Sequence, residues 1–399
     1  MSERITPDLI KQTNRQQIYN FIYDRKRVSQ LEIAFSLRLS RPTVTANLTE
    51  LETYGLIYKN GWQESNQTGR KPVGHSIVPD FRVAIGLELM RARAKIICVD
   101  LYGSPIRRQV LEIPYRNDPC YYATISESLM RFISDLKLSV QQVLGVGIAM
   151  QAVASQDGSS IVYGEILGCT GLTIDAFTRH LPFPCRFLHD PDAAAMCEIW
   201  CSPELNSAVY LSLSRHLGGS VISQRALMPG KHGHNATFEH IQAAEDGELC
   251  YCGRRGCWDT LCSMKALMGD EDPDHFFGKV RAGDKDALSR WNAYLDHLAR
   301  LIGNLHLVTD LDFILGGHLA PYFRQDDISR MYAAIRTSCP FDETDDYILI
   351  SKMPSHNITI GAALPYIKGF LSDIGQAIDG PKGDRDPEDG DPSQPDSKG

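Results

Sequence analysis

Long apolar runs are missing from this 399-residue sequence. No stretch approaches the roughly 20 apolar residues that a membrane-spanning helix requires, and residues 1–24 lack the layout of a secretory signal. A disulfide-type spacing of cysteines is missing too, because most of the eleven cysteines stand alone. Scattered cysteines are typical of a reducing compartment. The sequence therefore predicts a cytoplasmic protein with no membrane partner.

A strong charge of either sign is also absent, since the net charge is −8 with 43% apolar and 23% charged residues. These values are ordinary for a globular protein. Residues 1–80 carry eleven Lys and Arg against eight Asp and Glu, a balance of +3 that leaves −11 for the rest. A mildly basic head on an acidic body indicates a nucleic-acid-binding module. The length predicts two or three domains.

One dense group of metal-ligating residues lies in residues 238–262, FEHIQAAEDGELCYCGRRGCWDTLC. Cys3His is a closed ligand set for tetrahedral zinc, and Gly253 and Gly256 supply the left-handed conformations that such a knuckle needs. The alternative is a group of buried thiols with a core histidine. Three cysteines in eight residues favour a structural Zn2+, and Cys262 is assigned to the core. The predicted metal ligands are His240, Cys250, Cys252 and Cys257.

Three helices are predicted in the head. Apolar residues at helical spacing indicate the first over residues 8–24. Ser29 and Glu32 fit a capping box at the start of a short second helix. Ser40 caps the third helix, and Gly55 stops it before an extended segment. Helix, short turn, helix, then strand and hairpin is the layout of a winged helix-turn-helix.

The third helix is expected to present one face to DNA. Val44, Leu48 and Leu51 form an apolar stripe that must face inward. The opposite face is small and hydroxylated, so that it can approach the major groove and contact base edges. The alternative is a protein-interaction module whose exposed threonines are only solvated. The predicted DNA-contacting residues of this helix are Arg41, Pro42, Thr43, Thr45, Ala46 and Thr49.

Residues 61–74, GWQESNQTGRKPVG, are expected to form the wing. Arg70 and Lys71 lie on its bend, where cations can enter a minor groove or clamp phosphates. An ordinary basic linker between domains is the alternative. The wing is a second, independent indication of a DNA-binding head.

From residue 83 the pattern changes to β-strands. A second set of strands is expected to start at residues 208–213. Residues 375–399 are dominated by Asp, Gly, Pro, Lys and Ser, and are predicted to be a disordered acidic tail. The strands expected between these points are 83–89, 94–101, 106–113, 144–149 and 313–317, with helices near 121–136 and 284–307.

These motifs resemble those of the ROK family, which includes sugar-responsive repressors and sugar kinases. Its zinc motif is a histidine followed by C-x-C-G-x-x-G-C-x-E, with Asp259 in the last place here. Its repressors carry the same three helices and a Gly-Arg-Arg/Lys-Pro segment, which its kinases lack. The resemblance implies an α/β fold: a winged helix-turn-helix followed by an actin-like, ribonuclease-H-like sugar-kinase body of two lobes, each with three strands, a helix and a strand.

The resemblance also implies where a kinase would hold phosphate, and this sequence departs from the family there. The family turns read D-x-G-G-T and G-T-G-x-G-G. Residues 88–92, ELMRA, have neither glycine, and residues 214–219, SRHLGG, keep only the last pair. Asp190 matches the family's catalytic base, although an Asp before a helix is also an ordinary N-cap. Without a backbone cradle for phosphate we expect no enzyme activity.

The family's sugar pocket is altered as well. Thr237 stands where a G-E-x-G-H segment has its Glu, Glu165 stands at an Asn position, and Asp259 replaces the Glu after the knuckle. Carboxylates and hydroxyls can still bond sugar hydroxyls. These substitutions are compatible with an unusual sugar derivative as ligand. They are equally compatible with a pocket that binds no small ligand. The predicted effector-binding residues are Glu165, Asp190, Thr237, His240 and Asp259.

We therefore expect a DNA-binding head (1–80), a sugar-sensing and oligomerising body (81–374) and a tail (375–399). The expected function is a transcriptional repressor of carbohydrate-utilisation genes, bound to double-stranded operator DNA as a homodimer or homotetramer. A ligand that contacts His240 would change the spacing of two heads. The alternatives are an ATP-dependent hexose kinase with an accessory head and a regulator that responds to a protein partner.

Overall fold

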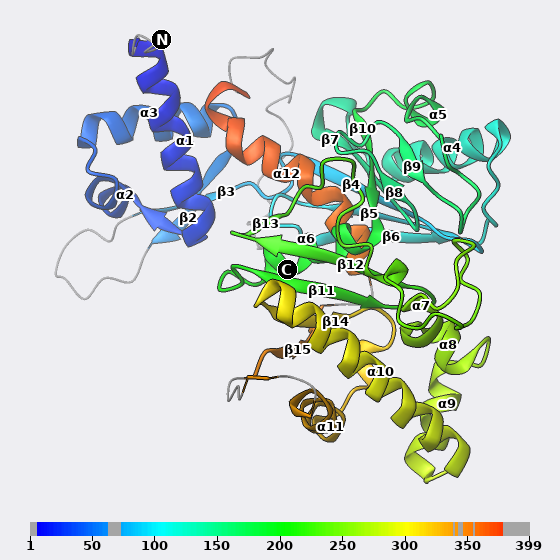
Figure 1. The fold of residues 1–399 in the computed structure, drawn as a ribbon. Coiled ribbons are helices and arrows are strands. Elements are labelled where there is room, and N and C mark those ends of the chain that lie inside the picture. The colour runs from blue at the N-terminus through cyan, green and yellow to red at the C-terminus, as the bar shows by residue number, and fades with distance from the viewer. Residues whose placement is uncertain (1–5, 63–72, 338–339, 342–345, 354–355, 378–399) are drawn as a thin grey trace, which may run out of the picture. The chain divides into compact units, whose positions relative to one another are not determined.

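The computed structural model describes residues 6–62, 73–337, 340–341, 346–353 and 356–377 (Figure 1). Clustering of contacts divides the chain into two units: residues 1–82 with 368–399, and residues 83–367. The predicted wing residues Arg70 and Lys71 lie outside the described residues. Within the described residues, no helix has both the length and the apolar character needed to cross a bilayer.

The first unit has the three helices that the sequence predicts. Ser29 and Glu32 form the expected capping box at the start of α2, and Ser40 accepts from the Thr43 amide as the N-cap of α3. A small antiparallel sheet of order β1-β3-β2 follows the helices. The elements are α1 (Pro7–Arg25), β1 (Val28–Ser29), α2 (Gln30–Ser36), α3 (Arg41–Thr53), β2 (Ile57–Trp62) and β3 (Val73–Ile77).

Helix α3 packs on α1 and α2 in the way its apolar stripe predicts, because Val44, Leu48 and Leu51 are all buried. Two ion pairs join α1 and α3 at Glu50 Oε1, which lies 2.8 Å from Arg15 Nη2 and 3.0 Å from Lys11 Nζ. The Arg15 side chain is 2% exposed, and the Glu50 carboxylate stabilises its buried charge.

The second unit contains two five-stranded sheets with the same topology. The first has the order β10-β7-β4-β5-β6 and the second the order β15-β14-β11-β12-β13. In each sheet the three strands that come first in the chain pair antiparallel as neighbours. The two later strands are added beside the first of them, in parallel. The strands of the first sheet are β4 (Val83–Leu89), β5 (Ala94–Val99), β6 (Pro105–Leu111), β7 (Val143–Met150) and β10 (Cys185–His189). Those of the second are β11 (Ala208–Leu213), β12 (Leu217–Ser223), β13 (Ala226–Leu227), β14 (Asp312–Gly316) and β15 (Ile348–Ile350). The duplication expected from the family resemblance is therefore present in the fold.

Helices cover both sheets, and a short hairpin extends the first lobe. In the first lobe these elements are α4 (Pro119–Asp135), η1 (Val140–Gln142), β8 (Val153–Ala154), β9 (Ile161–Tyr163) and α5 (Asp175–Thr178). In the second they are η2 (Phe238–His240), α7 (Asp259–Cys262), α8 (Met264–Met268), α9 (Pro273–Ala282), α10 (Lys285–Thr309), η3 (Ala320–Tyr322) and α11 (Gln325–Arg336). The long helix predicted near 284–307 is α10, capped by Asp284.

Two helices, α6 (Asp190–Cys201) and α12 (Asn357–Ala377), lie between the sheets (Figure 1). Glycines allow their backbones to approach very closely. A Cβ on Gly86 of β4 or Gly147 of β7 would lie 1.7 or 1.8 Å from a carbonyl oxygen of α12. A Cβ on Gly361 of α12 would lie 1.7 Å from the carbonyl oxygen of Ala193 in α6. The first sheet, α12 and α6 are thus stacked through backbone contacts, and α6 then packs on the second sheet.

Helix α12 also corrects the predicted start of the tail. The helix runs to Ala377, beyond the expected boundary at residue 375. Ile374 is fully buried and anchors the last turns, and each further residue adds a backbone hydrogen bond to a helix already formed. Residues 378–399 lie outside the described residues.

The substitution Gly361→Ala tests the contact between α6 and α12. Because the new Cβ would lie 1.7 Å from a backbone oxygen, one helix has to move. We expect the free energy of unfolding, measured by denaturant titration, to fall by about 3 kcal/mol. The control is Gly369→Ala on the same helix, where nothing lies within 4 Å. There alanine should stabilise the helix by up to about 1 kcal/mol, and equal losses for both variants would contradict the close contact.

Candidate functional site

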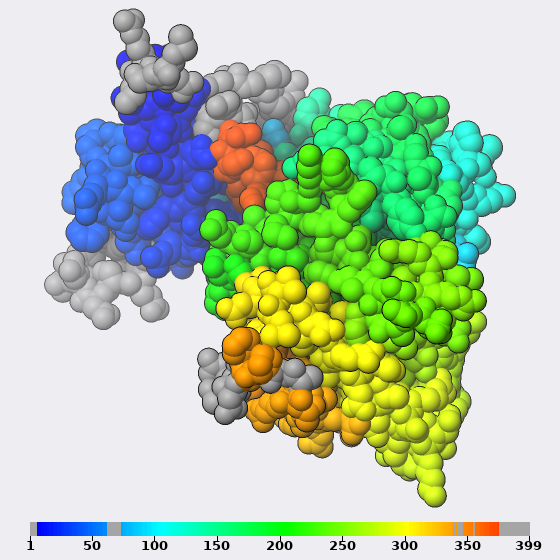
Figure 2. All heavy atoms as spheres, in the orientation of Figure 1, coloured from blue at the N-terminus to red at the C-terminus, as the bar shows by residue number. Residues whose placement is uncertain are grey.

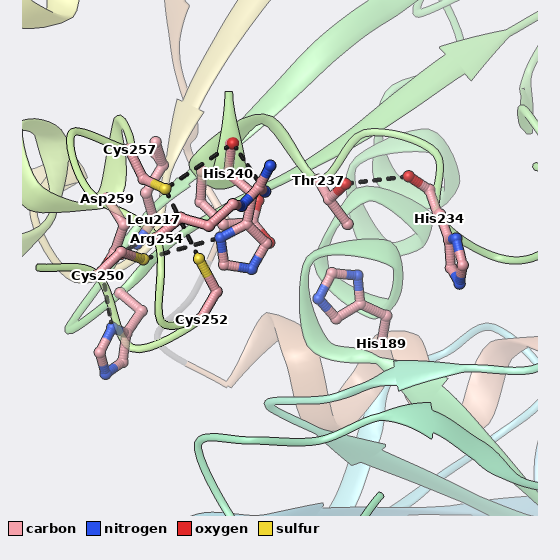
Figure 3. Close-up of polar contacts among 12 residues, drawn as sticks. His189, Leu217, His234, Thr237, His240, Cys250, Cys252, Arg254, Cys257 and Asp259 are labelled. Carbon is pink, nitrogen blue, oxygen red and sulfur yellow. Dashed lines mark hydrogen bonds and ion pairs between the residues drawn. The ribbon is translucent and has the colours of Figure 1, made fainter. Parts of the chain in front are cut away.

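The four predicted metal ligands meet at one point in the second lobe. One ligand atom from each of His240, Cys250, Cys252 and Cys257 lies within 4.8 Å of the other three (Figure 3). Cys250 Sγ is 3.8 Å from His240 Nδ1, and Cys252 Sγ is 3.7 Å from Cys257 Sγ. A tetrahedron with Zn–S bonds of ~2.3 Å has S–S edges of about 3.8 Å. The donor set and its spacing therefore fit a tetrahedral, thiophilic metal ion such as zinc.

The glycines of this knuckle have the predicted role. Gly253 and Gly256 have φ values of +82° and +72°, which side chains rarely adopt. A Cβ on Gly256 would also lie 1.7 Å from the carbonyl oxygen of Ala244. Cys262 lies outside the ligand cluster and is fully buried in the core of the second lobe, as expected.

A pocket lies next to the knuckle, at the carboxyl ends of β7, β10 and β11. This is where parallel α/β sheets usually bind ligands. Its space amounts to about 440 Å³ when the open mouth is included. Glu165 and Asp190, both predicted, line this pocket, and so do several polar residues that the sequence did not single out. Those residues are Gln151, Tyr163, His189, His216, Glu239 and Tyr251.

Asp190 is the first residue of α6 and is held in a buried, acidic environment. Burial, together with the nearby carboxylates of Glu88 and Asp192, raises the pKa of its carboxyl to about 8. His189 Nε2 lies 3.7 Å away, but burial lowers the pKa of that imidazole, so that no cation offsets the charge. Asp190 can therefore donate or accept a hydrogen bond in the pocket at neutral pH.

Three predicted effector residues, Thr237, His240 and Asp259, do not line the pocket. Thr237 donates from Oγ1 to the carbonyl oxygen of His234 at 3.0 Å and points away from His240 (Figure 3). Asp259 is buried behind the pocket wall, where its carboxylate accepts from the Leu217 amide at 2.8 Å and contacts His216 Nδ1 at 3.2 Å. Thr237 stands at the start of the 3-10 turn η2, and Asp259 holds the amide that begins β12, so neither side chain is placed for a direct contact in the pocket.

Glu239 is the acidic group of this turn that the sequence analysis missed. Its side chain lines the pocket, is 4% exposed, and has Oε1 3.9 Å from His240 Nε2. Burial, together with the carboxylates of Asp259 and Asp190, raises the pKa of the Glu239 carboxyl to about 8. The sequence did contain a signal for this residue, because Glu239 stands where the family segment G-E-x-G-H has its second Gly. Neighbouring residues thus face two sites: Glu239 faces the pocket, and His240 faces the cysteines.

The turns that would hold phosphate in a kinase are occupied by other contacts. Glu88 at the first turn forms an ion pair with Lys95 at 3.2 Å and accepts from Thr359 Oγ1 at 2.8 Å. At the second turn the Ser214 hydroxyl lies 3.0 Å from His318 Nδ1. Arg215, which could have held an anion, instead lies 2.8 Å from Asp270. These side chains at the two turns therefore have partners within the protein.

The predicted DNA-contacting face of α3 is on the surface. Thr43 is half-buried and the other five residues are exposed. The Thr45 hydroxyl donates to the Arg41 carbonyl at 2.8 Å and accepts from Gln30 Nε2 on α2. Gln30 is a further polar residue at this face that the sequence analysis did not identify. The predicted face residues are Arg41, Pro42, Thr43, Thr45, Ala46 and Thr49.

Comparison with known proteins identifies relatives of most of the chain. The ROK family profile matches residues 84–364. The DNA-binding transcriptional dual regulator NagC of Escherichia coli K12 is 26% identical over 266 residues, which cover 65% of this chain and 64% of NagC. The match thus spans less than two thirds of that regulator.

Two solved structures share the fold. The crystal structure of a ROK family transcriptional regulator, described as a homologue of the E. coli MLC protein, has a TM-score of 0.72 with 19% identity, covering 93% of this chain and 100% of that one. A ROK family glucokinase from Streptomyces griseus in complex with glucose and AMPPNP has a TM-score of 0.61 with 19% identity, covering 71% of this chain and 98% of the glucokinase.

The substitution Asp190→Asn tests the buried acid. Below the ordinary pKa of 3.8 the carboxyl is protonated in both the folded and the unfolded chain, so its contribution to stability is greatest there. That contribution is lost as the pH rises through the folded value of about 8. We expect the gain in stability of D190N over the wild type to grow by roughly 2–4 kcal/mol between about pH 5 and about pH 8.5.

The measurement is thermal and chemical unfolding at several pH values. Asp246→Asn is the matched control, because Asp246 is exposed in the knuckle segment. A gain for D190N that does not change with pH would contradict a buried carboxyl with a raised pKa.

Proposed function

The chain belongs to the ROK family, and from this membership we propose that it is a DNA-binding transcriptional regulator, a repressor, whose ROK body senses a sugar or sugar derivative without catalysis. The observation that carries the proposal is the pairing of two parts. A head with an exposed hydroxylated helix face precedes a kinase-like body whose turns at Glu88 and Ser214 lack family glycines and carry side chains that contact other residues. NagC is a DNA-binding regulator by name, which supports the same assignment.

The head is proposed to be a winged helix-turn-helix. Helix α3 is the recognition helix, with Arg41 and the small residues of its exposed face directed to the major groove. The segment between β2 and β3, with Arg70 and Lys71, is the wing that contacts phosphates or a minor groove. Because such heads read symmetric half-sites, we propose that the regulator acts as a homodimer or homotetramer.

The body is proposed to hold a structural Zn2+ and an effector. The ion would be bound by His240, Cys250, Cys252 and Cys257, and would fix the histidine ring and its tautomer. The pocket would bind the effector through Glu165, Asp190 and the newly identified Glu239. Thr237, His240 and Asp259 do not line the pocket and are not proposed as direct contacts.

Helix α12 supplies a physical route from effector to DNA. Its first part packs through glycines against β4, β7 and α6, and its last part belongs to the unit that contains the head. There Gln16 Nε2 of α1 donates to the Ser372 carbonyl oxygen. We propose that closure of the lobes around an effector moves α12 and so alters the spacing of two heads on DNA.

A sugar kinase is the second candidate, because Asp190 is present and the glucokinase shares the fold. The raised pKa of the Asp190 carboxyl suits a general base. Transfer also requires phosphate to be held, and the turns at Glu88 and Ser214 lack family glycines. ATP consumption with mixed hexoses separates the candidates, and we expect none above a protein-free blank.

The variant Cys252→Ser tests the metal. We expect about one zinc per chain in the wild type and in the control Cys120→Ser, which changes an exposed cysteine far from the knuckle in sequence. Loss of one of four ligands should release the zinc and lower the unfolding temperature by on the order of 5 °C or more. Mass spectrometry of the metal and thermal unfolding provide the readouts. A wild-type protein without bound metal would contradict the site.

The proposed function is tested by mapping bound DNA across the genome and measuring affinity for the recovered operator. Arg41→Ala and Thr49→Ala should each weaken operator binding about tenfold, since one base contact is worth roughly 1–3 kcal/mol. Arg179→Ala, which removes an exposed cation from the body, should leave the affinity unchanged. Equal affinity of all three variants, or no sequence-specific binding by the wild type, would refute the DNA-binding assignment.

A further inference from the structure

Glu239 is the least satisfied acidic group in the pocket. It lies on η2, its residue is 3% exposed, and it lines the cavity directly. Oε1 has a weak contact with His240 Nε2 at 3.9 Å, whereas Oε2 is buried with no hydrogen-bond partner. A buried polar atom without a partner costs about 1–3 kcal/mol, and more when it is charged. A ligand that brings a donor to Oε2 removes this cost.

The charge around Glu239 selects among donors. Three carboxyl groups line the pocket, those of Glu165, Asp190 and Glu239, and Asp259 is buried behind them. Among the described lining residues there is no Lys or Arg. A guanidinium does lie nearby, but Arg254 is directed to the backbone, where Nη2 donates to the His240 carbonyl at 3.2 Å. The lining thus offers no positive charge to a phosphate or carboxylate, whereas its grouped carboxyl groups can pair with a cationic donor.

A bare metal ion does not fit this requirement. Across the described part of the chain, His240 and the three knuckle cysteines form the one group that brings three or more ligating side chains together for a metal. The pocket carboxyl groups do not meet that condition. The cation must therefore be carried by an organic ligand.

The rest of the pocket fits a polyhydroxylated ligand. Gln151, His189 and His216 offer both donors and acceptors for hydroxyls. The Tyr251 ring packs edge-on against the rings of His216 and His240, with centroids 4.8 and 5.0 Å apart. With Tyr163 it lines an aromatic wall of the cavity, and such rings attract C–H faces and ammonium groups alike.

We propose that the effector is a sugar derivative that carries a free, protonated amine, and that Glu239 is the counter-ion of that amine. The inference rests on the proposed function, because it names the ligand class of the same pocket. Asp190 and Glu165 bond the neighbouring hydroxyls. Acidic sugars, sugar phosphates and N-acylated amino sugars are rejected, since they bring negative charge or lack the cation.

Isothermal titration calorimetry with the full-length protein tests the proposal. The probes are glucose, mannose and galactose, their 2-amino, 6-amino and 2-acetamido derivatives, and their 6-phosphates. At least one free amino sugar should bind ten or more times as tightly as its parent hexose and its acetamido form, with no detectable binding of the phosphates. Equal or tighter binding of a neutral or phosphorylated sugar overturns the proposal, and so does the absence of binding by every amine.

The variant Glu239→Gln tests whether Glu239 is the residue that pairs with the amine. It should reduce the preference for the amine over the hexose from tenfold or more to less than about threefold, at unchanged metal content. Glu245→Gln, which removes an exposed acid from the same segment, should keep the preference. A preference that survives in E239Q overturns the role of Glu239. If E239Q does not fold, the wild-type comparison alone decides the ligand class.

Operator binding measured on the same samples separates this inference from the proposed function. Intact operator binding without an amine preference would refute only the proposed ligand class. An amine preference without sequence-specific DNA binding removes the proposed function and retains the ligand class.

Discussion

The architecture of the body depends on backbone contacts between α12, α6 and the first sheet. At three places a glycine stands where any side chain would overlap a carbonyl oxygen: Gly86, Gly147 and Gly361. Small residues such as Ala193 and Ala362 fill the remaining space. Because the helices touch without intervening side chains, the two lobes share a thin, rigid layer. Asp190 starts α6 at the edge of this layer, so the position of its carboxyl is set by the packing that joins the lobes.

Much of the fold follows from local sequence. Caps at Ser29 and Ser40, a clear apolar stripe on α3, and strand runs such as residues 208–213 are each determined by neighbours in the chain, and the structure has them at the predicted residues. The metal ligands were likewise predictable, because four donors within eighteen residues leave few ways to fold around an ion. The repeat of the two sheets was expected only through the family resemblance.

The pocket was less predictable, because its side chains come from distant segments and their directions depend on short turns. Thr237 and Glu239 are two residues apart, and a 3-10 turn decides which of them faces inward. Asp259 is acidic and close in sequence to the knuckle, yet its carboxylate is used to hold the Leu217 amide. The burial that raises the pKa values of Asp190 and Glu239 arises from both lobes, which no single stretch of sequence reveals.

The side-chain contacts at Glu88 and Ser214 and the acidic lining of the pocket both support the proposal of a body that binds a polar ligand without transferring phosphate. The adjacency of Glu239 and His240 has a further consequence. In the proposed function, Glu239 contacts the ligand and His240 binds the metal together with the cysteines, so the pocket wall would keep its form only while the knuckle is intact. Loss of the metal would then also abolish the response to the effector, because a single peptide bond joins the two sites.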